Sequence, residues 1–277
     1  MERVTPSNDM RTSAFIAFGA AVSTLCLSGQ AATYFGNGNT GFGGPVGQGS
    51  LTLTDDGTTV SGTFTKGSGA MNDVLVLYVD SVPGGFSTTA NFTDNADGLR
   101  RAISGYDAFW GRSTLTMPSG FYADYAIALG PSSDNYGGLW QLQANASHNF
   151  INSVNLNPTG NNSASTYTFS FAVSDIGLTP GSGESFGLFG TLISNTAYRS
   201  DEALPGNVSG SQGWNPFASS GDVTYTIATV PEPSTLALLS LPGLAALFHI
   251  RRRNIDEQIG GPARTRTENQ SIMSALL

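Results

Sequence analysis

Apolar and polar residues alternate along most of the chain in short runs that turn-forming residues separate. In residues 167–173, Tyr-Thr-Phe-Ser-Phe-Ala-Val, the odd positions are apolar, which is typical of a strand with one face in a core. Residues 74–79 are instead continuously apolar between Asp73 and Asp80, so we expect a central strand. On these grounds strands are predicted at residues 50–54, 58–64, 73–79, 122–129, 139–144, 167–173, 186–193 and 223–229.

Turn signals join the predicted strands into one unit. Asp55-Asp56-Gly57 fits a tight hairpin turn between the first two strands. A helical period is weak and confined to residues 97–103. Because neither a charged linker nor an internal repeat interrupts the pattern, we predict a single all-β domain over residues 32–229, a β-sandwich of the jelly-roll kind.

Composition favours an ordered, exported β-protein. Charged residues make up only 12 % of the 277 residues. Glycine is abundant, with 35 residues in the whole chain. Disorder is the alternative for such a chain, but 16 Phe, 9 Tyr and 3 Trp need a core to bury them. Between Thr33 and Val230 five basic residues stand against fourteen acidic ones, a formal charge of −9. This balance excludes nucleic acid as a partner, since nucleic-acid binding depends on neutralising phosphates.

The N-terminus has the pattern of a secretion signal. Arg11 precedes an apolar stretch over residues 12–27, and Gly29 and Ala31 place small residues where a signal peptidase reads them. We therefore predict a signal peptide over residues 1–31. The only cysteine, Cys26, lies inside it, so the mature domain would have no disulfide, thiolate metal site or cysteine nucleophile.

The C-terminal segment combines three features in a fixed order. The first is the tripeptide Pro231-Glu232-Pro233, and the second is an apolar stretch over residues 236–250. The third is a run of three arginines, Arg251, Arg252 and Arg253. The apolar stretch is short beside the roughly 17–25 residues of a spanning helix. We expect a marginal transmembrane helix whose arginines stop translocation and stay in the cytoplasm.

This order resembles the PEP-CTERM sorting signal of exported bacterial proteins over residues 230–253. The resemblance implies recognition near the Pro-Glu-Pro by an exosortase-type processing enzyme, with transient anchoring in the inner membrane through the C-terminal helix. It implies further that the protein reaches the cell surface or the extracellular matrix of bacteria that make an extracellular polysaccharide. Residues 254–277 depart from the pattern as a polar tail, either a cytoplasmic extension or the product of a misassigned stop codon.

A second resemblance lies within the predicted domain. Residues 77–80, Leu-Tyr-Val-Asp, and residues 123–129, Ala-Asp-Tyr-Ala-Ile-Ala-Leu, are similar to strand patterns of DOMON and glucodextranase-type binding domains. Those domains are β-sandwiches that bind sugars or haem. The resemblance supports the sandwich more than the ligand, because a shared fold does not fix a function.

Patterns of catalytic residues are missing from the predicted domain. Its acidic residues occur singly in turns, whereas glycoside hydrolysis needs two facing carboxylates. No serine lies in a nucleophile elbow. His148, the single histidine of the domain, is expected to be a solvated loop residue, and one histidine cannot form a histidine-cluster zinc site. We therefore predict that the protein is not an enzyme.

An aromatic segment is the candidate for ligand binding. Tyr106, Asp107, Trp110 and Arg112 combine rings that stack on sugars with charges that bind hydroxyl groups. The alternative is that these rings fill the core, which we expect for Trp140 because it alternates with apolar neighbours. The predicted function is thus an exported surface or matrix protein without catalysis, and the alternative is a carbohydrate-binding module acting on extracellular polysaccharide.

Calcium is the one metal for which the sequence offers a candidate site. Asp94, Asn95 and Asp97 precede a glycine and place oxygen ligands close together. The spacing lacks the alternation and the closing Glu of an EF-hand loop. We favour a plain turn, because Asp, Asn and Gly form such turns without a metal.

Overall fold

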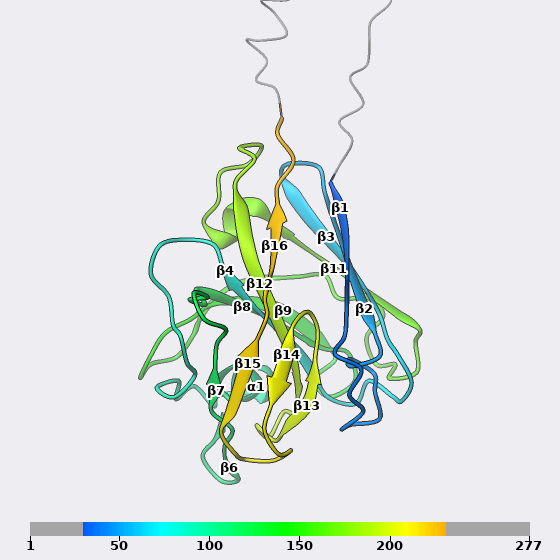
Figure 1. The fold of residues 1–277 in the computed structure, drawn as a ribbon, viewed down its shortest axis with the longest axis vertical. Helices are drawn as coiled ribbons and strands as arrows, with labels where there is room; N and C mark the ends of the chain where they lie inside the picture. The colour runs from blue at the N-terminus through cyan, green and yellow to red at the C-terminus, as the bar shows by residue number, and fades with distance from the viewer. Residues whose placement is uncertain (1–29, 231–277) are drawn as a thin grey trace, which may run out of the picture.

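The computed structural model describes residues 30–230, which form two antiparallel sheets packed face to face (Figure 1). The smaller sheet has the order β1-β2-β3-β11, with β1 (Ala31–Phe35), β2 (Ser50–Asp55), β3 (Thr59–Thr65) and β11 (Thr166–Ala172). The larger sheet has the order β10-β9-β8-β4-β12-β13, and β16 also pairs with β12. Its strands are β4 (Val74–Asp80), β8 (Tyr125–Gly130), β9 (Tyr136–Gln141), β10 (Asn149–Ser153), β12 (Ser185–Ile193), β13 (Arg199–Ala203) and β16 (Val223–Thr226).

Shorter elements cover the outer face of the larger sheet and one end of the sandwich. They are α1 (Gly98–Ser104), β5 (Tyr106–Asp107), β6 (Gly111–Arg112), β7 (Leu115–Thr116), η1 (Val173–Ile176), β14 (Asn207–Ser209) and β15 (Phe217–Ser220). The helix α1 begins at Asp97, whose side chain accepts a hydrogen bond from the Arg100 backbone N–H, and ends at Gly105 in the left-handed conformation.

The larger sheet is buried on both faces. One face of β4, with Leu75 and Leu77, packs against the inward rings of β11 such as Phe169. The opposite face, with Val76, packs against Ile103 of α1. A strand with apolar neighbours on both sides has no polar face, which explains the continuous apolar run of β4.

The structure confirms an all-β domain and each of the eight predicted strands to within a few residues. It also confirms a helix near residues 97–103 and the hairpin turn, where Asp55 accepts a hydrogen bond from the Gly57 N–H and Gly57 has a φ of 84°. Two antiparallel sheets packed face to face agree with the predicted sandwich, and the jelly-roll connectivity as a whole stays a prediction. Consecutive strands pair in β1-β2-β3 and β8-β9-β10, while β12 returns to lie beside β4, so that β12-β4-β8-β9 has the strand order of a Greek key.

The two ends of the described chain lie together at one end of the sandwich (Figure 1). The Tyr225 hydroxyl lies 2.8 Å from the Gln30 carbonyl oxygen, and the Val230 N–H donates to the Gly181 carbonyl at 3.1 Å. The hairpin β5–β6 lies at the opposite end, which we call the distal tip (Figure 1). Within residues 30–230 no helix has the length and apolar character needed to cross a membrane.

Candidate functional site

The predicted aromatic segment forms the hairpin β5–β6 at the distal tip, and Asp107 fixes its turn. One Asp107 carboxylate oxygen accepts hydrogen bonds from the backbone N–H groups of Phe109 at 2.8 Å and Trp110 at 3.1 Å. The other oxygen lies 3.2 Å from Nε of Arg101 on α1. The carboxylate is therefore engaged within the protein and holds the two aromatic residues in place, which differs from its predicted role as a ligand contact.

Arg112 is engaged in a similar way. Its guanidinium carbon lies 4.4 Å from the centre of the Tyr106 ring, and it donates to the Thr89 carbonyl at 3.1 Å. Burial lowers the pKa of Arg112, and a cation over an aromatic face is favourable. Of the four predicted residues, Trp110 alone has most of its side chain open to solvent, at 54 %.

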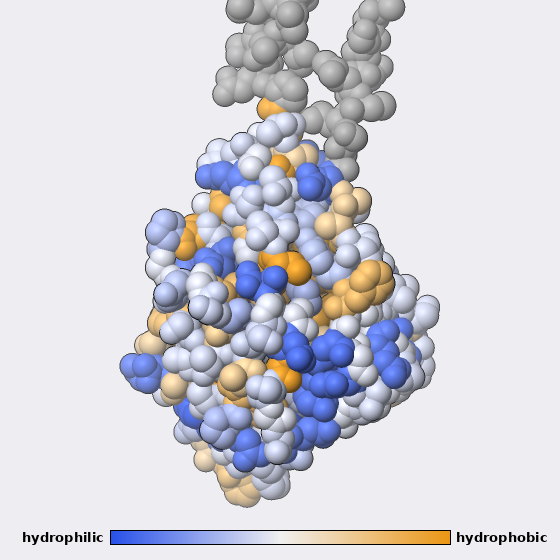
Figure 2. Space-filling view, viewed as in Figure 1, coloured by the Kyte–Doolittle hydropathy of each residue, from blue (hydrophilic) through white to orange (hydrophobic). Residues whose placement is uncertain are grey.

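Four contacts between rings extend the exposed tip into a continuous aromatic row. Phe109 packs edge-on against Trp110, which stacks on Trp214 with ring centres 5.9 Å apart and planes 7° apart. Tyr198 meets Trp214 edge-on at 4.9 Å and stacks on Phe42 at 6.0 Å. We call Phe109, Trp110, Trp214, Tyr198 and Phe42 the aromatic row. The segment with Phe109, which is 82 % exposed, forms part of the tip, where Figure 2 shows apolar surface.

Backbone contacts hold Trp214 in the row. Its indole N–H donates to the Thr196 carbonyl at 2.9 Å, and its side chain lies over Gly111. A Cβ at Gly111 would be 3.4 Å from Trp214, and the φ of +133° at this position favours glycine. The sequence analysis missed Trp214, although a tryptophan within the polar segment Ser-Gln-Gly-Trp-Asn was a signal that it is not a core residue.

A buried carboxylate fixes the glycine-rich segment that carries Phe42. Glu202 of β13 is fully buried and accepts four backbone hydrogen bonds, from Phe42 and Gly44 on one oxygen and from Val46 and Gly47 on the other. Hydrogen bonds to a charged acceptor are stronger than neutral ones. One end of the row is thus anchored through Glu202 and the other through Asp107.

The segment proposed for calcium has structural partners. Asp94 is buried, and one of its oxygens accepts the His148 N–H at 2.7 Å and lies 3.5 Å from Arg100 Nε. Asp97 caps α1 and pairs with the Arg100 guanidinium at 2.8 Å. Asn95 is half-buried. The carboxylates therefore act in a helix-capping turn, and within residues 30–230 no group of three potential metal ligands occurs.

His148 is buried, so the expectation of a solvated loop histidine is wrong. Only 2 % of it is exposed, and its Nδ1 accepts a hydrogen bond from the Gln143 N–H at 3.1 Å. The proton of the neutral ring therefore lies on Nε2, which donates to the Ser104 hydroxyl at 3.0 Å. Burial lowers the pKa of His148 to about 4, with Asp94 opposing the shift and Arg100 adding to it.

Comparison with known proteins identifies the C-terminal segment. The family model of the PEP-CTERM protein-sorting motif matches residues 229–253. The chain carries a PEP-CTERM sorting motif. PEP-CTERM signals are recognised by exosortase-type processing enzymes, so the motif implies that the protein is exported and processed at the membrane. No curated protein and no solved structure matches the chain.

Several predicted features lie outside the described residues and stay predictions. They are the PEP-CTERM tripeptide Pro231, Glu232 and Pro233, the apolar stretch 236–250, the arginines Arg251, Arg252 and Arg253, the tail 254–277 and all but the last two residues of the signal peptide. Of the residues that the PEP-CTERM model matches, Thr229 and Val230 belong to the described part. The sorting motif thus begins where the β-domain ends.

Proposed function

We propose that this PEP-CTERM protein is a non-catalytic surface or matrix protein whose β-domain binds extracellular polysaccharide through the aromatic row. The observation that carries the proposal is the position of the row. It lies at the distal tip, whereas the sorting motif begins at the opposite end of the domain (Figure 1). A protein held at the membrane through that motif would present the row to its surroundings.

The construction of the row suits a sugar ligand. Sugar rings have apolar C–H faces that stack on aromatic side chains, while ligand sites usually add a few polar groups for orientation. Trp110 and Phe109 present ring surface to solvent, and the hydrogen bonds of Asp107 order them before a ligand arrives. A site that is ordered in advance loses little conformational entropy on binding.

The absence of catalysis is proposed from the one serine–histidine pair that the described residues bring together. A serine nucleophile needs a histidine nitrogen that accepts its proton. Here Nε2 of His148 already carries a proton and donates to Ser104, and both residues are buried. The pair therefore serves packing and hydrogen bonding. Size-exclusion chromatography of polysaccharide incubated with the protein is expected to show no chain shortening.

Affinity electrophoresis through the extracellular polysaccharide of the host would test the binding site. The variant Phe109→Ala/Trp110→Ala removes both exposed rings, and this loss of ring contact is expected to cost about 1.4 kcal/mol of binding free energy. A cost of this size weakens binding about tenfold. Tyr122→Ala is the matched control, since Tyr122 is 49 % exposed and lies outside the row. Unchanged binding of the double variant, or an equal loss in the control, would show that the row is not the binding site.

A further inference from the structure

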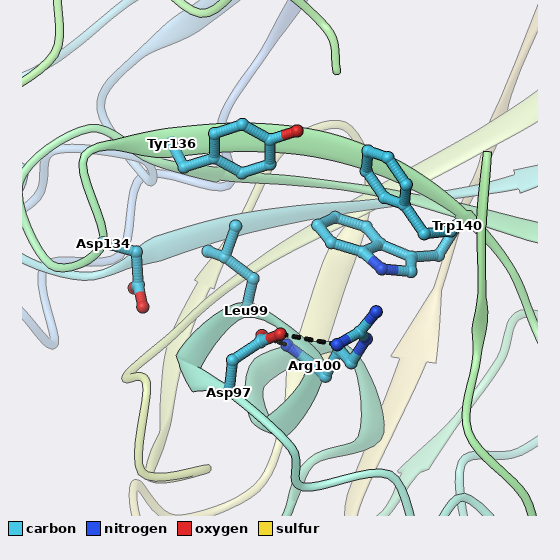
Figure 3. A pocket seen from close by; sticks show the side chains of 7 residues that line it. Asp97, Leu99, Arg100, Asp134, Tyr136 and Trp140 are labelled. Carbon is cyan, nitrogen blue, oxygen red and sulfur yellow. Dashed lines mark hydrogen bonds and ion pairs between the residues drawn. The ribbon is translucent and has the colours of Figure 1, made fainter. Parts of the chain in front are cut away.

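A pocket of about 290 Å³ opens beside α1, on the outer face of the larger sheet (Figure 3). It is lined by α1, the β8–β9 turn, β9 and β10, through Asp97, Leu99, Arg100, Asp134, Tyr136, Trp140 and Phe150. None of these residues belongs to the aromatic row. The volume lies at the small end of the range for ligand pockets, which suits a single ring better than a chain.

Three aromatic side chains from neighbouring strands form one wall of the pocket. Trp140 of β9 is paired with Phe150 of β10, and their rings meet edge-on with centres 5.6 Å apart. Trp140 is buried, as the sequence predicts, whereas Phe150 is 44 % exposed and Tyr136 is 37 % exposed. These two rings of the lining are therefore partly open to solvent and can offer apolar faces to a ligand.

Polar atoms without partners complete the lining. The Trp140 Nε1 and the Asp134 Oδ2 are buried and have no hydrogen-bond partner among the described residues, whereas the Arg100 Nε lies 3.5 Å from the Asp94 carboxylate. Figure 3 shows the Trp140 indole nitrogen facing Arg100, with Asp134 on the far side of Leu99. Buried polar groups without partners are rare in folded proteins because each costs free energy. Here one donor, the Trp140 Nε1, and one acceptor, the Asp134 Oδ2, belong to residues that line the same pocket.

Two glycines make room for the acceptor. A Cβ at Gly98 would collide with one carboxylate oxygen of Asp134, and a Cβ at Gly130 would lie 3.1 Å from the other. The Asp134 carboxylate thus lies between α1 and the end of β8. Within the described part of the chain it forms no salt bridge.

The charges select against an anionic ligand. The only cation of the lining, Arg100, is already paired with Asp97 at 2.8 Å and with Asp94 at 3.5 Å. Asp134 then leaves the pocket negative, and a ligand carboxylate would meet like charge. A hydroxyl group both donates and accepts hydrogen bonds, so a ring with several hydroxyls can donate to Asp134 on one side and accept from Trp140 on the other.

We propose that this pocket binds one neutral sugar unit, with its apolar face on Tyr136 and Phe150. Its hydroxyl groups donate to Asp134 and accept from the Trp140 Nε1. The pocket and the aromatic row would both bind carbohydrate, but they share no residue. The site is separate from the aromatic row, and its ligand class is narrower.

Isothermal titration calorimetry of the intact, processed protein tests the pocket directly. The probes are the methyl glycosides of glucose, galactose, mannose and N-acetylglucosamine, with methyl glucuronide as the acidic counterpart. At least one neutral glycoside is expected to bind, and methyl glucuronide at least tenfold more weakly. Asp134→Ala and Trp140→Phe should each weaken binding about tenfold, because each removes one hydrogen-bonding atom.

Two controls separate the pocket from other effects. Asp222→Ala removes the same charge at an exposed position outside the pocket, and Tyr122→Ala removes an exposed ring outside both the pocket and the aromatic row; both should bind the glycoside as the parent does. If no neutral glycoside binds, if the glucuronide binds as well, or if Asp134→Ala has no effect, the inference is wrong. Loss of glycoside binding in Trp110→Ala would place the sugar in the row instead. Polysaccharide binding through the row is judged separately, by electrophoresis of the Phe109→Ala/Trp110→Ala variant.

Discussion

Replacing Glu202 by glutamine tests whether one buried carboxylate holds the glycine-rich segment in place. The glutamine side chain has nearly the same shape, but its amide nitrogen cannot accept a hydrogen bond. Two of the four backbone N–H groups, such as those of Val46 and Gly47, would then face a donor and lose their partner. Hydrogen bonds to charged groups contribute about 1.5–3 kcal/mol each, so we expect a loss of about 3–5 kcal/mol in the free energy of unfolding.

Urea unfolding followed by tryptophan fluorescence measures this loss. The slope rises with protein size, so a value of about 3 kcal/mol per molar urea applies to this domain and the midpoint should fall by about 1–2 M. Glu184→Gln is the control, because Glu184 also accepts a backbone N–H and a hydroxyl hydrogen bond but lies on the surface. We expect the control to leave the midpoint nearly unchanged.

The charge of Glu202 offers a second readout. Burial first, and the charge of Glu202 second, raise the pKa of Asp73. In Glu202→Gln the second cause disappears, so an NMR titration should find the pKa of Asp73 lower than in the parent. A midpoint within about 0.3 M of the parent, together with an unchanged titration of Asp73, would refute the assignment of Glu202 as the anchor of the segment.

Three further predictions concern pH, sorting and metal. Because the pKa of His148 is about 4 in the fold and 6.5 ordinarily, the unfolded chain binds more protons between these values, and stability should fall by about 3 kcal/mol as the pH drops through them; urea midpoints across this range should fall less steeply in His148→Gln. Glu232→Ala should leave export intact but keep the protein in the membrane fraction of the host, and normal release would contradict a role in processing. Chelation with EDTA should not move the thermal midpoint, whereas a large drop would establish a calcium site near Asp94.

Local periodicity was enough to predict eight strands of the two sheets, but it missed β1, β10 and β13 and it did not locate the sites. In β11 each residue shows by its own polarity which face it occupies, so alternation alone locates the strand. Phe42 and Trp214 of the aromatic row are separated by more than half of the domain's sequence. Only tertiary packing brings such distant segments together. Asp134 and Phe150 of the pocket lie in a turn and an edge strand, where composition carries no signal of a neighbour.

The burial of His148 likewise could not be predicted from its neighbours in the sequence. Its neighbours in the sequence, Asn145-Ala146-Ser147-His148-Asn149, are polar and indicate a loop at the surface. In the fold its ring finds a hydrogen-bond partner in Ser104 and packs against Phe92, both distant in the sequence. The Asp94–Asp97 segment forms a capping turn, which depends on local sequence, whereas its ion pairs with Arg100 needed the helix to form.

The position of both chain ends opposite the distal tip has a mechanical consequence. With the protein held through its C-terminal segment and a polymer bound at the tip, tension would pull on β16 along the direction of the strand (Figure 1). The pairs from Ser185↔Thr226 to Leu188↔Val223 would then be loaded together, in shear, and not opened one after another like a zipper. A short terminal strand aligned with the pulling direction resists detachment from a moving matrix better than the same strand set across it.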